Sequence, residues 1–393
     1  MPVKPLVRVT ATDVPVLTEA LRVALAGGPA VWPVPAALGF ETGGEGPPHP
    51  AEIAEGIALV VETSGSTDAP KRVMLSADAL IASADATADR LDGPGRWLLA
   101  LPGHYIAGAQ VLVRSIIAGT TPVLLGDGPF TAEAFAAASA RLDAAAPRYT
   151  SLVPVQLARV VERAQRDAFV AAALTGYDAV LVGGQALAPE LAARAEELGA
   201  RIVRTYGSSE TAGGCVYDGR ALDGVGVRTV DGLVELSGPV LADGYLGDAE
   251  RTAAVFTSDA RGTRWYRTGD LGELTADGVL RISGRADDVI ISGGVKVALG
   301  EVERAVRTRP GFGEAVVVAV AHPEWGERPA VVSPATDAAT SATLDDLASA
   351  TDAAGLPQAA RPVRLVIVDG LPLLASGKPD RRAIAAALAA PAN

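Results

Sequence analysis

Cysteine is nearly absent from this 393-residue chain: Cys215 stands alone, so no disulfide can form within the chain. Proteins without disulfides are typical of a reducing compartment, and we expect a cytoplasmic protein. Long hydrophobic runs are missing as well, because nowhere do about 18 apolar residues follow one another, and we expect no membrane-spanning helix. The N-terminal stretch MPVKPLVRVTATDVPVLTEA meets prolines and acids before an apolar segment of signal-peptide length can form.

Positive charge is also scarce. The chain has 46 acidic and 34 basic residues and a formal net charge of −12, which argues against non-specific binding to nucleic acid or anionic membranes. Only four of the basic residues are lysines, namely Lys4, Lys71, Lys296 and Lys378, and the last three lie in the stretches 63–72, 284–301 and 372–382. A compact ammonium group suits contacts with phosphate or carboxylate oxygens, so these three lysines are candidates for binding an anionic ligand.

Between residues 56 and 206 short β-branched runs alternate with segments of helical period. The runs predict strands at 56–62, 96–102, 121–126, 148–154, 178–184 and 201–207. Helices are predicted near 76–90, 107–118, 131–144, 154–165 and 188–198. This alternation predicts an α/β fold with a large, doubly wound layer, and ligands of such layers bind at the carboxyl ends of the strands.

The pattern changes twice further along the chain. From about residue 213 frequent glycines and short alternating strands predict an antiparallel β subdomain. From residue 285 a helix (301–308), a strand (314–320), a helical piece to about 355 and a strand (363–369) predict a small α+β domain. We therefore expect two domains, residues 1–284 and 285–393.

The stretch TSGSTDAPK, residues 63–71, has the composition of a phosphate-binding loop without the spacing of a Walker loop. Its hydroxyls, its glycine and its lysine are suited to phosphate oxygens: Thr63, Ser64, Gly65, Ser66, Thr67 and Lys71. Taken alone, the stretch could equally be a hydroxyl-rich turn with no ligand.

Further motifs follow in order: LPGHYIAG, GGQAL, TYGSSETAGG, YRTGDLG, GRADDVIISGGVKVALGEVE and LPLLASGKPDRR. Together with the first loop they resemble the adenylate-forming superfamily of acyl-coenzyme A synthetases, luciferases and peptide-synthetase adenylation domains. The resemblance spans residues 63 to 382. It implies an enzyme that joins a carboxylate to the α-phosphate of ATP, releases pyrophosphate, and then passes the acyl group to a thiol, usually that of coenzyme A. Positioning and electrostatic stabilisation would supply most of the catalysis.

The resemblance also implies roles for single residues. The phosphate loop would hold the β- and γ-phosphates of ATP. Residues 206–209 and 184–186 would enclose the adenine, with Tyr206 stacked on it: Gly184, Gln185, Ala186, Tyr206, Gly207, Ser208 and Ser209. Asp270 would accept hydrogen bonds from the ribose hydroxyls, with Arg285 beside it. Glu210 would bind Mg²⁺, which prefers hard oxygen ligands.

The C-terminal motifs are implied to alternate at one site. Lys378 would bridge the substrate carboxylate and the α-phosphate during adenylation, because an ammonium can follow charge that develops on several oxygens. Asp287 would be the hinge about which the small domain rotates. After the rotation Gly293, Gly294 and Lys296 would replace Lys378 and admit the pantetheine arm of coenzyme A. Read alone, the Asp-Asp and Gly-Gly pairs are ordinary interdomain turns.

The segments LPGHYIAGAQVLVRS and YGSSETAGGCVYDG resemble the compact 2-succinylbenzoate–coenzyme A ligases of menaquinone biosynthesis in high-G+C bacteria. Only 62 residues precede the phosphate loop, and we expect a shortened N-terminal lobe. This substrate has a second carboxylate, and an arginine fits a carboxylate with two parallel hydrogen bonds. Arg114 is our candidate, and a surface or helix-capping charge is the alternative. Ser208 and Thr211 are candidate donors, His104 would shape the acyl pocket, and Gly213, Gly214 and Cys215 would line the slot for the ring.

Two residues depart from the pattern of the superfamily: Asp68 and Arg72 stand where glycine is usual. They put the affinity for the pyrophosphate side of ATP in doubt, unless Asp68 points away or pairs with Arg72. Two other functions remain open, a ligase for another aliphatic or aryl acid and a nucleotide-binding relative without catalysis. The sequence leaves the oligomeric state open, with a homodimer among the alternatives.

Overall fold

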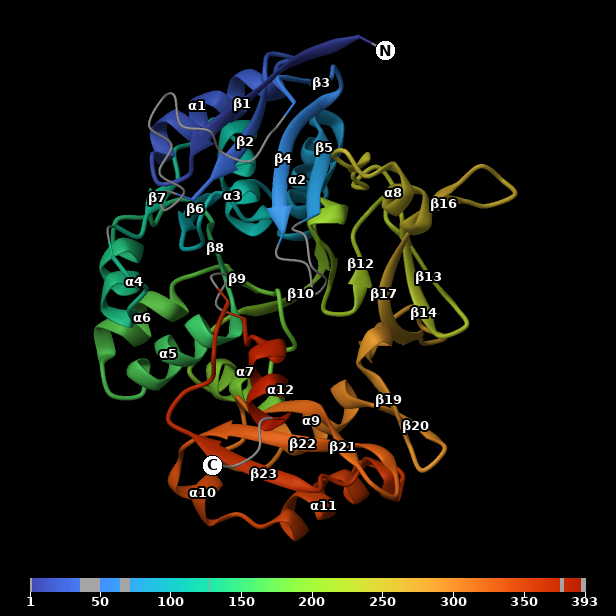
Figure 1. Ribbon diagram of the computed structural model, residues 1–393. Coiled ribbons are helices and arrows are strands. Elements are labelled where there is room, and N and C mark those ends of the chain that lie inside the picture. The colour runs from blue at the N-terminus through green and yellow to red at the C-terminus, as the bar shows by residue number, and fades with distance from the viewer. Residues whose placement is uncertain (1, 36–49, 64–70, 127, 375–377, 390–393) are drawn as a thin grey trace.

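The computed structural model describes residues 2–35, 50–63, 71–126, 128–374 and 378–389. This part of the chain forms four β-sheets with helices packed around them. Figure 1 shows the first three sheets in the upper body of the molecule and the fourth, drawn in orange and red, below it. In the described ranges no helix has the length and apolar character needed to cross a membrane.

The largest sheet has seven strands in the order β12-β11-β10-β9-β8-β6-β7. Five of its strands are parallel, from β10 to β7, and all five were predicted from the sequence. Its strands are β6 (Arg96–Leu99), β7 (Val123–Leu124), β8 (Arg148–Leu152), β9 (Ala179–Val182), β10 (Ile202–Ser208), β11 (Gly213–Tyr217) and β12 (Arg220–Ala221). The predicted α/β class is thereby confirmed.

A second sheet contains a strand that the sequence analysis placed wrongly. Residues 56–62 were expected in the parallel layer, but β4 lies in a six-stranded sheet of order β15-β5-β4-β2-β1-β3 and pairs antiparallel with β5. The strands are β1 (Val3–Thr10), β2 (Ala30–Val34), β3 (Glu52–Ala54), β4 (Ile57–Thr63), β5 (Lys71–Ser76) and β15 (Gly244–Tyr245). A continuous apolar run shows that both faces of a strand are covered, but it does not show which sheet contains the strand.

Helices fill the space between these two sheets and cover the far face of the larger one. In β6, Trp97 and Leu99 belong to a core shared with α2, α3 and the six-stranded sheet, whereas Leu98 faces a second core with α4 to α7. This alternation follows from the two-residue period of a strand. The helices are α1 (Val14–Leu25), α2 (Ala77–Arg90), α3 (Ile106–Ile117), α4 (Ala132–Ser139), α5 (Pro154–Ala164), α6 (Ala168–Thr175) and α7 (Pro189–Glu197).

The third sheet is the predicted antiparallel subdomain, and all of its strand pairs are antiparallel. It comprises β13 (Gly226–Val230), β14 (Leu233–Ser237), β16 (Phe256–Ser258), β17 (Arg264–Leu274) and β18 (Leu280–Arg285), with α8 (Ala249–Val255) beside it. Register pairing places Asp270 opposite Arg285. Two motifs that lie apart in the sequence are thus side by side.

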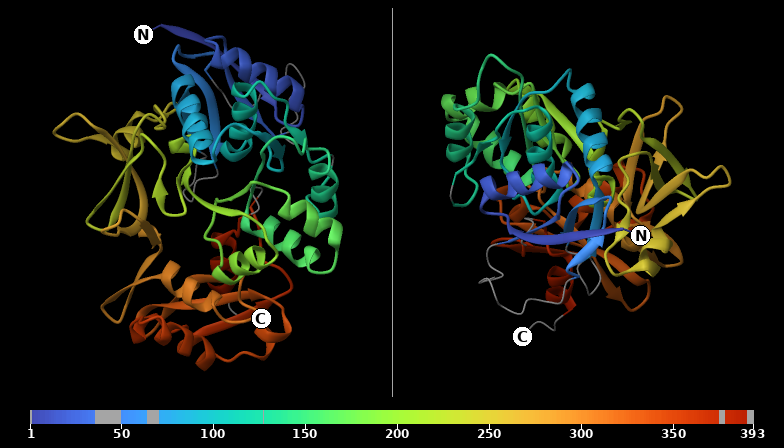
Figure 2. Two further views of the ribbon diagram at one scale, coloured as in Figure 1. Left: turned by 180° about the vertical axis from the view of Figure 1, so that it is seen from behind. Right: turned by 90° about the horizontal axis from the view of Figure 1, so that it is seen from above.

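The fourth sheet has helices on both faces. Its strands are β19 (Val289–Ser292), β20 (Val295–Ala298), β21 (Val316–His322), β22 (Gly326–Pro334) and β23 (Arg364–Val368). Its helices are α9 (Leu299–Arg307), α10 (Asp337–Ser341), α11 (Leu344–Ala353) and α12 (Arg381–Ala389). One face packs on α9 and α11, and the other receives Ile384 and Leu388 of α12. Both figures show α12 between this sheet and the upper body (Figures 1 and 2).

Candidate active site

Two loops that follow neighbouring strands carry most of the candidate residues for the nucleotide. The loop after β9 carries Gly184, Gln185 and Ala186, and the end of β10 carries Tyr206, Gly207 and Ser208. These two strands are parallel neighbours, so their carboxyl ends lie at the same edge of the sheet. Thr63 ends β4 of the other sheet, and its hydroxyl donates to the Lys71 carbonyl at 3.5 Å.

Tyr206 and Asp270, the candidates for adenine and ribose, are in direct contact. The Tyr206 hydroxyl donates to Asp270 Oδ2 at 2.6 Å, and Arg285 Nη1 donates to Oδ1 at 3.3 Å. Burial raises the pKa of Asp270, and the hydrogen bonds from Tyr206 and Arg285 oppose that rise. Arg285 also makes two hydrogen bonds to Asp287, at 2.9 and 3.1 Å. Arg285 therefore connects the candidate ribose carboxylate to the candidate hinge.

Glu210 lies on a short 3-10 helix, Ser209–Thr211, and only 5% of its surface is exposed. Tyr245 donates its hydroxyl proton to Glu210 Oε1 at 2.8 Å. Within the described residues Oε2 accepts no hydrogen bond, so one oxygen remains for a metal ion. No group of three or more metal-ligating side chains occurs in the described ranges. This arrangement fits Mg²⁺, which takes one or two carboxylates and completes its shell with phosphate and water.

Tyr245 is a residue that the sequence analysis missed. It lies in β15, which pairs with β5, and Lys71 Nζ lies 5.7 Å from the centre of its ring. Tyr245 thus contacts both the lysine of the phosphate loop and the candidate metal ligand. In the sequence, the signal for Tyr245 was an aromatic residue directly after Gly244. Only the pairing of β15 with β5 shows that this tyrosine lies beside Lys71 and Glu210.

Lys378 lies at this site. A Cβ atom built on Gly184 would be 3.7 Å from Lys378 Cε. Lys378 is exposed at the surface of the protein, and other protein groups lie close to its side chain. Partial desolvation by these neighbours and the charge of Arg285 lower the pKa of Lys378, whereas Asp270 and Glu210 raise it. The structure therefore brings Lys378 together with the candidate residues for ribose and metal.

The turn after β10 determines what Ser208 and Thr211 can do. Ser208 Oγ accepts from the Glu210 amide at 3.2 Å, which orients the 3-10 helix. The Thr211 hydroxyl donates to the Gly213 carbonyl at 2.8 Å and accepts from the Ser208 amide at 2.9 Å. Thr211 is fully buried, so its only hydroxyl proton is used within the turn. The expectation that Thr211 donates to a substrate therefore gives way to a role in holding the turn.

Close packing explains the glycines of this turn. A Cβ on Gly207 would lie 2.1 Å from the Gly213 carbonyl oxygen. Gly213 has a φ of +105°, a conformation that glycine adopts readily. Its Cβ position lies 3.5 Å from Gln110 Cγ and 3.9 Å from Ile106 Cγ1, both on α3. Gly213 therefore faces α3, whereas the Cβ position of the neighbouring Gly214 faces Thr205 and Tyr217 of the sheet.

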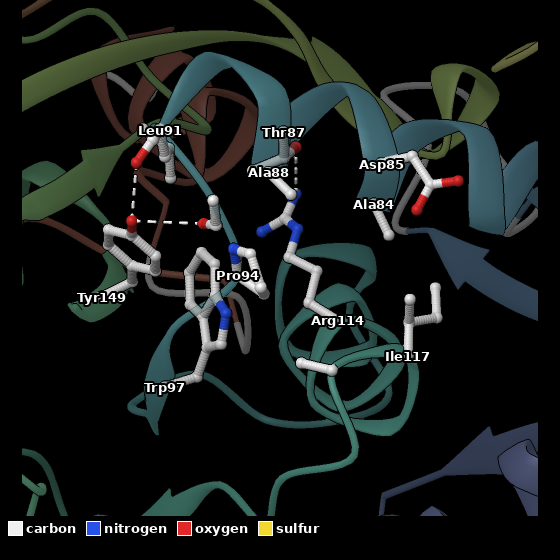
Figure 3. A pocket seen from close by; sticks show the side chains of 12 residues that line it. Ala84, Asp85, Thr87, Ala88, Leu91, Pro94, Trp97, Arg114, Ile117 and Tyr149 are labelled. Carbon is white, nitrogen blue, oxygen red and sulfur yellow. Dashed lines mark hydrogen bonds between the residues drawn. The ribbon is translucent and has the colours of Figure 1, made fainter. Parts of the chain in front are cut away.

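Arg114 is on the same face of α3 as Gln110, one turn further along, and its guanidinium is buried (Figure 3). Nη2 donates to Thr87 Oγ1 at 3.2 Å, and the guanidinium lies 5.0 Å from the centre of the Trp97 ring. Thr87 is also hydrogen-bonded to Tyr217 at 3.0 Å. In the described part of the chain Arg114 has no carboxylate partner, and its Nε has no hydrogen-bond partner. The alternative of a surface charge is wrong.

A cavity of about 30 Å³ lies next to this guanidinium and is lined by Trp97, Tyr149 and Leu91, among others. In Figure 3 Asp85 points away from Arg114, on the outer side of α2. Burial lowers the pKa of Arg114 and the Tyr217 hydroxyl opposes this effect. A buried cation without a counter-ion is costly, so this position would gain from an anionic ligand.

The remaining predicted residues lie apart from Lys378 or outside the description. Gly293, Gly294 and Lys296 are exposed at the β19–β20 hairpin, which projects away from the upper body (Figure 1). Ser64, Gly65, Ser66 and Thr67 lie outside the described residues, as does Asp68. Arg72 pairs with Glu62 at 3.3 Å and lies 4.8 Å from the centre of the Trp32 ring.

Burial shifts the pKa of two further side chains, His104 and Cys215. His104 precedes α3, its ring centre is 4.1 Å from that of Tyr105, and burial lowers its pKa. A neutral imidazole is therefore expected at neutral pH. Cys215 is fully buried, and burial raises the pKa of its thiol to about 12. Such a thiol forms almost no thiolate, which agrees with the expectation that it is no nucleophile.

Comparison with protein families gives two matches. Residues 7–241 match "AMP-binding enzyme", and residues 301–378 match "AMP-binding enzyme C-terminal domain". A probable 2-succinylbenzoate–CoA ligase of Mycobacterium tuberculosis (strain CDC 1551 / Oshkosh) is 42% identical over 337 residues, which is 85% of this chain and 85% of that protein. The 2-succinylbenzoate–CoA ligase of Enterococcus faecalis is 27% identical and matches 84% of this chain and 69% of its own length.

Solved structures share the fold. A variant of E. coli MenE with bound OSB-AMS has a TM-score of 0.73 and 26% identity, over 98% of this chain and 87% of that one. The amide bond synthetase McbA from Marinactinospora thermotolerans has a TM-score of 0.76 and 25% identity, over 98% of this chain and 80% of its own. Proteins that share this fold therefore differ in the reactions that their names describe.

Proposed function

The chain belongs to the AMP-binding enzyme family, and from that premise we propose that it is a 2-succinylbenzoate–CoA ligase. It would activate the succinyl carboxylate with ATP, release pyrophosphate, and transfer the acyl group to coenzyme A with release of AMP. This reaction would place the enzyme in the cytoplasm and in menaquinone biosynthesis. The observation that carries the proposed reaction is the position of Lys378, next to Gly184 and within electrostatic range of Asp270 and Glu210.

In the first half-reaction a carboxylate oxygen forms a bond to the α-phosphorus of ATP while the bond to pyrophosphate breaks. Lys378 would hold the attacking carboxylate and the α-phosphate together and stabilise the negative charge that develops on them. Glu210 would hold Mg²⁺, which neutralises phosphate charge. Tyr245 orients the Glu210 carboxylate through its hydrogen bond at 2.8 Å.

The nucleotide would bind across the two sheets. Lys71 and Thr63, with residues 64–67, would hold the β- and γ-phosphates. Tyr206 would stack on adenine against residues 184–186. Asp270 would exchange its hydrogen bond from Tyr206 for hydrogen bonds from the ribose hydroxyls, with Arg285 still beside it.

In the second half-reaction the sulfur of coenzyme A bonds to the acyl carbon, the bond to AMP breaks, and the thiol proton is lost. We place the domain boundary between residues 284 and 285 and the hinge at Asp287. Rotation there would remove Lys378 and bring Gly293, Gly294 and Lys296 to the site. The exposed position of these three residues leaves them free to contact a second surface.

The choice of acid is supported by the 42% identical relative and by Arg114. Its buried guanidinium has Thr87 and Trp97 as neutral partners. A substrate with a second carboxylate would supply the missing negative charge, since arginine and carboxylate match in geometry. An acid with one carboxylate would leave the guanidinium uncompensated. His104 and Gly213 would shape the pocket between these two ends.

Separate assays of the two half-reactions test this proposal. Lys378→Ala should abolish acyl-adenylate formation and leave the transfer from preformed acyl-adenylate to coenzyme A largely intact. Equal loss of both half-reactions would contradict the role of Lys378. Pyrophosphate release with a panel of acids tests the substrate: release with hexanoate or benzoate but none with 2-succinylbenzoate would remove the assignment. ATP binding without any pyrophosphate exchange would instead indicate a non-catalytic relative.

A further inference from the structure

A buried cluster of charges lies in the small body, outside the site described above. Glu303 of α9 has 6% of its surface exposed. Its Oε2 accepts from Arg381 Nη2 at 2.5 Å and from the Val317 amide at 3.0 Å, and its Oε1 forms an ion pair with Arg307 Nη2 at 2.8 Å. Arg381 also donates to the Val317 carbonyl at 2.8 Å. One carboxylate thus connects α9, β21 and the start of α12.

Arg381 is an unusual choice for its position in the helix. It is the first residue of α12, where the positive end of the helix dipole disfavours a cation. The packing of α12 on β21 is supplied by Ile384 and Leu388 further along the helix. The contacts of Arg381 therefore serve to hold the beginning of α12 in place.

The beginning of α12 is tightly connected to Lys378, three residues earlier. The Lys378 carbonyl accepts from the Leu374 amide, and the Asp380 amide donates to the Pro372 carbonyl, both at 2.8 Å. Pro379 restricts the backbone between them, and Asp380 Oδ1 caps the helix by accepting from the Ala383 amide at 3.0 Å. A displacement of Arg381 would consequently move the Lys378 backbone.

We propose that Glu303 and Arg381 are positioning residues for adenylation, which hold the segment of Lys378 against the core of the small body. This inference rests on the proposed role of Lys378. Neither residue has to touch ATP or the acid. A misplacement of about 1 Å can lower a rate by about 100-fold, so we expect Arg381→Met to slow adenylation by about 10- to 100-fold. Transfer to coenzyme A, which does not use Lys378, should change by less than about threefold.

Arg381→Met is a milder change than removal of Glu303, because Glu303 keeps its ion pair with Arg307. A matched control is Arg361→Met, which removes an exposed pair of hydrogen bonds to Asp352 at 2.8 and 2.9 Å elsewhere in the same body. The control should leave both half-reactions unchanged. Arg381→Lys keeps the charge and should recover part of the adenylation rate.

The decisive measurement compares the two half-reactions of the full-length Arg381→Met enzyme. If Arg381 acts through Lys378, the loss should be confined to adenylation, the step that Lys378→Ala abolishes, and transfer from preformed acyl-adenylate should be kept. Equal losses in the two half-reactions, or an unchanged adenylation rate, would overturn the inference. If Lys378→Ala itself spared adenylation, the proposed role of Lys378 would fall and the inference with it. If Lys378→Ala selectively impairs adenylation but Arg381→Met does not, the inference on Arg381 is wrong and the proposed role of Lys378 stands.

Discussion

Arg114→Met should separate stability from substrate choice, because the guanidinium is buried without a carboxylate partner in the described part of the chain. Removing an uncompensated buried charge recovers several kcal/mol. The variant loses the hydrogen bond to Thr87, worth about 1.5–3 kcal/mol, and the contact with Trp97, worth about 2 kcal/mol. Methionine fills much of the same space. We therefore expect the free energy of unfolding to stay within about 1 kcal/mol or to rise.

The same substitution should remove discrimination between acids. Loss of one partner of a buried charged pair costs about 2–4 kcal/mol, which corresponds to a factor of about 30 to 1000. The quantity to measure is the ratio of kcat/KM for 2-succinylbenzoate to kcat/KM for benzoylpropionate, which lacks the ring carboxylate. Pyrophosphate release gives these rates. The ratio should fall toward unity, mainly through the loss of activity with 2-succinylbenzoate.

Arg264→Met is a matched control, since Arg264 also lies over an aromatic ring, 4.4 Å from the centre of Phe256. Its guanidinium donates to the carbonyls of Ala242 and Asp243 at 2.7 and 2.9 Å. This control should lose stability and keep the ratio. The reasoning on Arg114 would be refuted by a loss of more than about 3 kcal/mol in urea unfolding, or by a ratio that changes less than threefold.

Two further predictions concern pH and packing. Desolvation and the charge of Arg285 lower the pKa of Lys378 from 10.5, so kcat/KM for ATP in adenylation should fall as the pH rises, and the fall should begin below pH 10.5, where the ammonium loses its proton. Lys378→Arg should remove this fall, since guanidinium stays protonated. If the fall persists in Lys378→Arg, another group causes it. Gly207→Ala should lower the free energy of unfolding by about 1–3 kcal/mol, because its Cβ would lie 2.1 Å from the Gly213 carbonyl oxygen. The control is Gly56→Ala, whose Cβ would have no neighbour within 4 Å. Similar effects of the two changes on the free energy of unfolding would contradict the packing argument.

Much of the α/β layer followed from local pattern. The five parallel strands were found because their apolar runs are bounded by polar and glycine-rich loops. β4 has the same kind of run but belongs to the other sheet, where it pairs with β5. Helix α1 was not predicted, although Asp13 caps it through its side chain. A local pattern reports burial and period, whereas the partner of a strand is set by contacts with distant residues.

For the site, motif order indicated the residues but not their contacts. Tyr245 went unnoticed because its contact with Glu210 requires β15 to join β5. Thr211 had the chemistry of a substrate donor, but the turn uses its proton. Whether Arg114 is buried could not be read from α3 alone, since its burial depends on α2, Trp97 and Tyr217.

The sequence by itself determined which chemical groups are present and in which order they follow the strands, because motif composition and hydrophobic period are local properties. Tertiary structure alone decided that Lys378 lies beside Gly184 and near Asp270 and Glu210, while the β19–β20 hairpin with Gly293 and Gly294 projects away from the upper body. Both sets of residues belong to one small body that follows Asp287. Which set faces the site depends on how two folded surfaces pack against each other, and the order of residues along the chain carries no such information.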